Sequence, residues 1–64
     1  MANFWLTKKM VLEALRMTEG QPQNTTILFK GDSESVNGKI YTIVEIMACG
    51  KKKTIREEFK GETL

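Results

Sequence analysis

The stretch that decides the fold is residues 37–50, NGKIYTIVEIMACG. Its apolar side chains recur at spacings of three and four residues, the period of an amphipathic helix: Ile40, Ile43, Val44, Met47 and Ala48. Asn37 is a favoured residue at a helix N-terminus, and Gly50 is a favoured residue just past a helix end. The pattern therefore predicts an amphipathic helix between Asn37 and Gly50.

Upstream of this stretch, the sequence predicts another amphipathic helix from about Thr7 to Glu19. Thr7 is a suitable N-cap, while Gly20 and Pro22 are typical of a helix end. Charged side chains fall mainly on one side of this helix, and the other side carries an apolar stripe of Met10, Val11, Ala14 and Leu15.

Strands are expected between and after the two helices. Residues 24–30 are rich in β-branched and aromatic side chains, which favours a strand. Residues 31–33, Gly-Asp-Ser, are typical of a turn, after which residues 34–36 would form a short return strand. Residues 54–59 fit a strand or a helix, because their apolar positions share a face in either structure.

Several segments resemble the histidine-containing phosphocarrier protein (HPr) of the bacterial sugar phosphotransferase system. The resembling segments are residues 35–39 (SVNGK), 47–50 (MACG) and 54–62 (TIREEFKGE). The resemblance implies a truncated, divergent HPr-like α/β (α+β) domain spanning residues 1–64. Its order would be (short β)-α-β-β-α-β, with a small antiparallel sheet, two amphipathic helices on one face, and residues 54–59 as a strand. Residues 4–6 would supply the short first strand.

The chain contains no histidine, so the chemistry of that family is missing. In the HPr comparison the phosphoryl-accepting histidine corresponds to Lys9, whose ammonium group is protonated and not nucleophilic at neutral pH. The arginine that clamps the phosphoryl group corresponds to Val11, and the regulatory serine corresponds to Ile40. We therefore expect neither an enzyme nor a phosphocarrier, and neither a cofactor nor a metal site.

The small size of the chain suggests a second copy of itself as a partner. A domain of 64 residues is near the lower limit for folding on one core. Cys49 is the only cysteine, which excludes a disulfide within the chain and suits a reducing cytoplasm. We expect a homodimer through an open sheet edge. Phe4 and Trp5 are candidate dimer contacts, unless they fold back onto the core.

No apolar run approaches the roughly 20 residues that a transmembrane helix needs, so no membrane association is expected. The resemblance instead implies a protein-docking patch at the start of the first helix and on the exposed face of the second. Its counterpart here comprises Lys8, Lys9, Tyr41, Thr42 and Glu45, and the alternative is an ordinary solvated surface.

The strongest charge feature is a basic cluster of Lys51, Lys52, Lys53 and Arg56. Four cations in six residues suit the phosphates of RNA or DNA, or else the carbonyl end of the preceding helix. The leading hypothesis is a non-catalytic binding or regulatory protein that acts through protein contacts, such as a phage-encoded modulator of a bacterial host. The alternative is an RNA- or DNA-binding regulator that uses the basic cluster.

Overall fold

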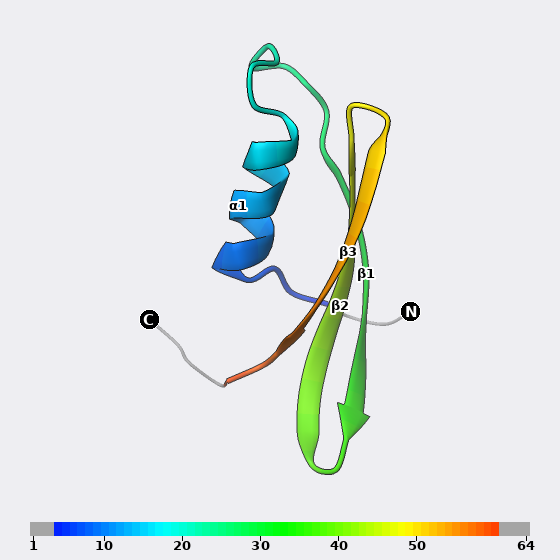
Figure 1. The fold of residues 1–64 in the computed structure, drawn as a ribbon. Helices are drawn as coiled ribbons and strands as arrows, with labels where there is room; N and C mark the ends of the chain where they lie inside the picture. The colour runs from blue at the N-terminus through cyan, green and yellow to red at the C-terminus, as the bar shows by residue number, and fades with distance from the viewer. Residues whose placement is uncertain (1–3, 61–64) are drawn as a thin grey trace.

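One helix is followed by three strands in the computed structural model, which describes residues 4–60 (Figure 1). The helix is α1 (Lys8–Met17), and the strands are β1 (Leu28–Val36), β2 (Lys39–Ala48) and β3 (Lys51–Glu58). The strands form one antiparallel sheet in the order β1-β2-β3, so β2 is the middle strand. The Gly61-Glu62 segment, which contributed to the resemblance, lies outside the described residues.

Two tight hairpins make this sheet a simple meander. Val36 pairs with Lys39 across the first turn, and Ala48 pairs with Lys51 across the second. The two residues inside each turn have positive φ: 53° and 78° at Asn37 and Gly38, and 53° and 72° at Cys49 and Gly50. Positive φ at both central residues marks a type I′ turn, whose twist matches that of the flanking strands.

The prediction of a helix between Asn37 and Gly50 is wrong, because these residues form β2 and its two turns. From Tyr41 to Ala48, every second side chain of β2 is buried, and the side chains between them are half-buried. Since both faces of this middle strand carry apolar residues, the period of two was hidden beneath apparent spacings of three and four. The many β-branched residues and the Asn37-Gly38 pair are the signals that favour a strand after a hairpin.

The expected order (short β)-α-β-β-α-β is therefore replaced by α-β-β-β within residues 4–60. Residues 31–33 form no turn, because β1 runs through them and includes the expected return strand at 34–36. Residues 4–6 form no strand. The helix expected at Thr7–Glu19 is confirmed as α1, and residues 54–58 belong to a strand, as the resemblance implied.

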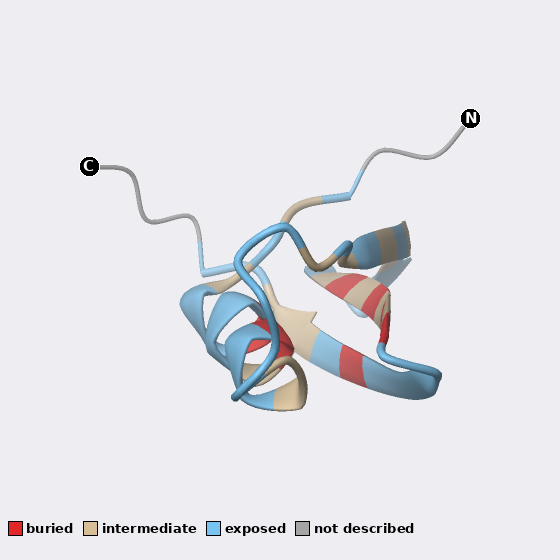
Figure 2. Ribbon diagram, turned by 90° about the horizontal axis from the view of Figure 1, so that it is seen from above, coloured by how far each residue is buried: buried red, intermediate tan, exposed pale blue. Residues whose placement is uncertain are grey.

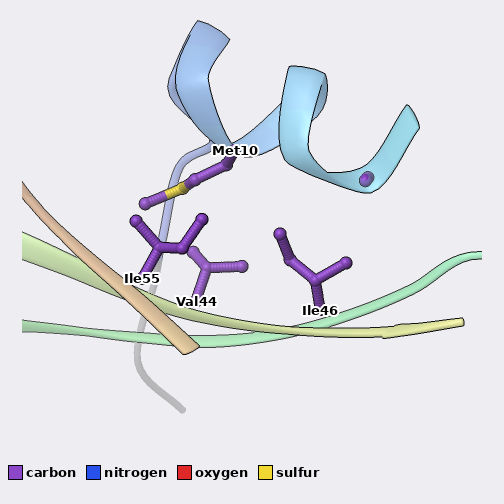
Figure 3. Close-up of a cluster of buried hydrophobic side chains, with 5 residues drawn as sticks. Met10, Val44, Ile46 and Ile55 are labelled. Atoms are coloured by element: carbon purple, nitrogen blue, oxygen red, sulfur yellow. The ribbon is translucent and has the colours of Figure 1, made fainter. Parts of the chain in front are cut away.

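A single small core joins α1 to the sheet (Figure 3). Met10 and Ala14 of α1 pack on Val44 and Ile46 of β2 and on Ile55 of β3. α1 packs chiefly on β2, and the buried residues gather where the helix faces the sheet (Figure 2). We call this side of the sheet the helix face and the other side the open face, which no described element covers.

The segment before α1 crosses the helix face and is fixed to β2 by one threonine. The Thr42 hydroxyl donates to the Trp5 carbonyl oxygen at 2.9 Å and accepts from the Trp5 backbone N–H at 3.4 Å. The Trp5 ring meets the Phe59 ring edge-on at a centroid distance of 5.0 Å. The Phe4 ring lies against Gly31, where a Cβ would collide with it. A glycine in the middle of β1 thus admits an aromatic side chain.

Replacing Thr42 by valine tests this anchor. Thr42→Val keeps the shape of the side chain but leaves the Trp5 N–H and carbonyl without their partner. We expect the free energy of unfolding to fall by about 1–3 kcal/mol, measured by urea denaturation with fluorescence of the single tryptophan. Thr42→Ser, which keeps the hydroxyl, should lose clearly less. Equal stability of the valine variant and the parent chain would contradict the anchor.

The second turn offers a test of the meander. Cys49 adopts the left-handed conformation at φ 53°, which asparagine accepts more readily than most residues. Cys49→Asn should therefore raise the free energy of unfolding by about 1 kcal/mol. The reverse change in the first turn, Asn37→Cys, should lower it by a similar amount. A destabilised Cys49→Asn variant in urea denaturation would argue against a type I′ turn at this position.

Candidate functional site

The docking patch implied by the HPr resemblance is divided between two sides of the molecule. Lys8 and Lys9 are exposed in the first turn of α1. Tyr41 and Glu45 point to the open face of the sheet, because they alternate with the buried residues of β2. Thr42 is fully buried beneath Trp5 and is not available to a partner. These five residues therefore form no common surface.

The basic cluster is divided in the same way, because β3 is a strand. Lys51 and Lys53 share a face with buried Ile55, whereas Lys52 and Arg56 lie on the open face. Ion pairs within the chain engage three of the four cations. The Lys53 Nζ lies 3.2 Å from a Glu13 carboxylate oxygen of α1, and the Lys52 Nζ lies 3.6 Å from a Glu45 carboxylate oxygen of β2.

Arg56 makes the shortest of these contacts. Its Nε donates to a carboxylate oxygen of Glu34 at 2.8 Å, which joins the two outer strands across β2. The guanidinium lies over the Tyr41 ring, 3.9 Å from the ring centroid. A cation over an aromatic face is attracted by the ring quadrupole. Although exposed ion pairs add little stability, together these contacts occupy the charged side chains around Tyr41.

The divided and paired cluster is a poor match for a phosphate backbone. We expect no binding of single-stranded or duplex nucleic acid at physiological ionic strength in fluorescence-anisotropy titrations, since few unpaired cations share one face. Low-micromolar binding that weakens steeply with salt and is lost on changing Lys51, Lys52 and Lys53 to alanine would contradict this expectation.

Phe4 and Trp5 fold back onto their own sheet. Trp5 is half-buried and held by Thr42 and Phe59, while Phe4 is 38% exposed against Gly31. Their contacts are therefore largely made within the chain. Both side chains thus fold back onto the sheet of their own chain.

The surface that sequence reasoning missed is on α1. Val11, Leu12 and Leu15 are 41%, 50% and 56% exposed, and we call them the outward helix patch. Val11 and Leu15 are four residues apart, and Leu12 and Leu15 are three apart, so their side chains are neighbours on the helix. The stripe expected to face the core included Val11 and Leu15, whereas only Met10 and Ala14 of that stripe are buried. Leu12, off the expected stripe, was the available signal that α1 is apolar on a second side.

Positive charge borders the outward helix patch. Lys8 and Lys9 lie in the first turn of α1, which contains no acidic residue, and Arg16 lies in the last turn. Glu13, the acidic residue of α1, pairs with Lys53 of β3 at 3.2 Å and, more loosely, with Arg16 at 3.9 Å. Because the N-terminus of a helix carries a partial positive charge, the two lysines are electrostatically unfavourable there. Helix stability alone does not explain their presence.

Other kinds of site find little support in residues 4–60. Within this range, no three His, Cys, Asp or Glu side chains gather closely enough to hold a metal ion. Cys49 is an exposed thiol in the second turn. No described helix has the length and apolar character to cross a bilayer. Comparison with protein-family models, curated proteins and solved structures gives no match.

Proposed function

We propose that the protein is a non-catalytic binding module that docks on another protein through the outward helix patch. The partner would present an apolar groove with carboxylates at its rim. The observation that carries the proposal is the exposure of three aliphatic side chains side by side on α1, each more than two-fifths exposed. Contiguous apolar surface of this kind is typical of interaction sites, and helix-in-groove recognition uses anchors at this spacing.

The charged residues around the outward helix patch indicate what kind of partner would bind there. Lys8, Lys9 and Arg16 border the patch, and Glu13 is drawn away toward Lys53. Arg16 lies 3.9 Å from the same Glu13 oxygen, so an acidic rim on the partner would chiefly face Lys8 and Lys9. Such a rim speeds association and discriminates among partners more than it raises affinity. Placing two lysines in the first turn has a stability cost, which contact with an acidic partner would offset.

The open face of the sheet is a weaker candidate for the same role. Its central apolar side chains, Tyr41, Ile43 and Met47, are half-buried rather than exposed. The ion pairs of Arg56 with Glu34 and of Lys52 with Glu45 lie among them. A partner would have to displace or accommodate these pairs. An antiparallel sheet with one solvated face is also common in small proteins.

The size of the patch bounds the affinity. Full burial of a leucine contributes about 1.5–3 kcal/mol, and these side chains are already about half covered, so each adds about 1 kcal/mol. Three such side chains fall short of the roughly 8 kcal/mol of a micromolar complex, even before the cost of association. The proposal is therefore a weak, regulatory contact unless several copies act together. A cytoplasmic place of action fits the exposed thiol of Cys49.

Matched leucines allow a clean test of the docking surface. Leu15 on α1 and Leu28 on the open face are both 56% exposed. A partner would be captured from bacterial lysate by photo-crosslinking, then purified and titrated against variants. We expect Leu12→Ser with Leu15→Ser to weaken binding about tenfold or more through lost apolar burial, whereas Leu28→Ser leaves it unchanged. The opposite pattern would sink the proposal, as would failure to crosslink any specific protein.

Charge reversal at the two lysines should separate stability from binding. Lys8→Glu with Lys9→Glu places acids at the positive end of the α1 dipole. The free energy of unfolding should therefore rise by about 0.5 kcal/mol. Binding to the partner should weaken, and its dependence on salt should become smaller or reverse. A variant that is stabilised yet binds as the parent chain does would show that the rim plays no part.

A further inference from the structure

The free edge of β3 has a regular pattern of outward-pointing backbone groups. Ala48 and Lys51 flank a two-residue turn, so they form a hydrogen-bonded pair, and such pairs alternate along the ladder. The Phe59 N–H donates to the Ile40 carbonyl oxygen at 2.8 Å, which fixes the same alternation at the far end. The odd-numbered residues of β3 therefore bond to β2. The even-numbered residues direct their N–H and carbonyl groups to the free edge.

This pattern restricts how a second copy can pair with β3. In an antiparallel pair, outward-pointing residues must face outward-pointing residues, so even numbers lie opposite even numbers. A twofold axis then passes through one residue of each strand. If the twofold axis passes through Lys53 or Arg56, that cation lies opposite the same residue of the second copy. Centring the pairing at Thr54 sets Lys52 opposite Arg56, and like charges directly opposite are destabilising.

Centring the pairing at Ile55 avoids every such conflict. Lys53 then lies opposite Glu57 of the second copy on the helix face, and Lys52 lies opposite Glu58 on the open face. Thr54 lies opposite Arg56, and the two Ile55 side chains meet at the axis. Opposite charges and β-branched pairs across strands are the combinations that stabilise a ladder. The strand sequence KKKTIREE is thus complementary to itself in one register.

We propose that two copies of the chain associate through β3 in this Ile55-centred register, so that the two sheets become one. The partner of this edge is a second copy of the same protein. Glu57 and Glu58 form no ion pair with residues in the 4–60 range, so both carboxylates are available to the second copy. Lys52 and Lys53 of that copy would then be shared between these carboxylates and Glu45 and Glu13, their partners within the chain. Pairing also covers the edge of Ile55, which belongs to the small core.

The rest of the fold leaves room for this contact. α1 packs chiefly on β2 rather than over the edge of β3. Residues 51–54 and Arg56 are exposed. The axis is perpendicular to the sheet, because paired residues point to the same side of it. Both copies of α1 therefore lie on the same side of the joined sheet, and the inference stands whether or not α1 docks on a partner.

The free edge of β1 is a poorer site for the same contact. The turn at Asn37-Gly38 directs the even-numbered residues of β1 to β2 and its odd-numbered residues outward. Centring a pairing at Asp32 sets two aspartates opposite each other. Centring it at Gly31 sets Lys30 opposite Asp32, but the two glycines at the axis have no side chains to pack. β3 is the edge that combines opposite charges with apolar side chains at the axis.

Charge exchange between two variants tests both the edge and the register. The parent chain should sediment at twice 7.3 kDa as concentration rises. Lys52→Glu and Glu58→Lys each set like charges opposite at both ends of the contact, so each homodimer should weaken about tenfold. A mixture of the two variants restores opposite charges at both ends. Equimolar mixing should return association to within a few fold of the parent.

Amide hydrogen exchange supplies an independent readout. The Thr54 and Arg56 amides point to the free edge and should become protected as concentration rises, whereas those of Gly31 and Ser33 on the β1 edge should not. A chain that remains monomeric at millimolar concentration with freely exchanging Thr54 and Arg56 amides would overturn the proposal. A dimer that protects Gly31 and Ser33 instead, or variants whose mixture fails to recover association, would also overturn it.

Discussion

The packing of Met10 and Ala14 on Val44 and Ile46 is the contact on which the rest of the structure depends. It is the main junction between the helix and the sheet, and it lies on the middle strand. Burying the helix face of β2 fixes which of its residues point outward, since side chains alternate along a strand. The pairing register then determines which residues of β1 and β3 lie on each face of the sheet. The positions of Tyr41, Glu45 and the lysines of β3 follow from this one contact.

A core of this size covers one face of the sheet and one side of the helix. The remaining surfaces differ in whether ion pairs within the chain occupy them. Ion pairs around Tyr41 occupy the open face, while the outward helix patch lacks any such cover. The edge of β3 carries charges that complement a second copy. Association through that edge would place two outward helix patches on one side, and two weak contacts held together bind more tightly than one.

Local signals predicted the first helix but not the middle of the chain. Thr7 and the stop at Gly20 bounded α1 well, because capping is a local property. The helix prediction for residues 37–50 was wrong because apolar residues on both faces of a middle strand produce spacings that resemble a helical period. The Asn37-Gly38 pair was the overlooked hairpin signal. Of the expected site residues, Lys8 and Lys9 border the outward helix patch. Thr42 is buried, because the packing of α1 on the sheet determines which side chains of β2 point inward.

The most direct test of this account is a nuclear Overhauser measurement on β2 and β3. In an antiparallel ladder the α-protons of non-hydrogen-bonded partners lie close together. We predict strong contacts between the α-protons of Glu45 and Thr54 and between those of Ile43 and Arg56, which are paired in the sheet. Strong sequential amide–amide contacts through residues 40–48 without these cross-strand contacts would mean that this stretch is a helix. That result would contradict the fold and the surfaces inferred from it.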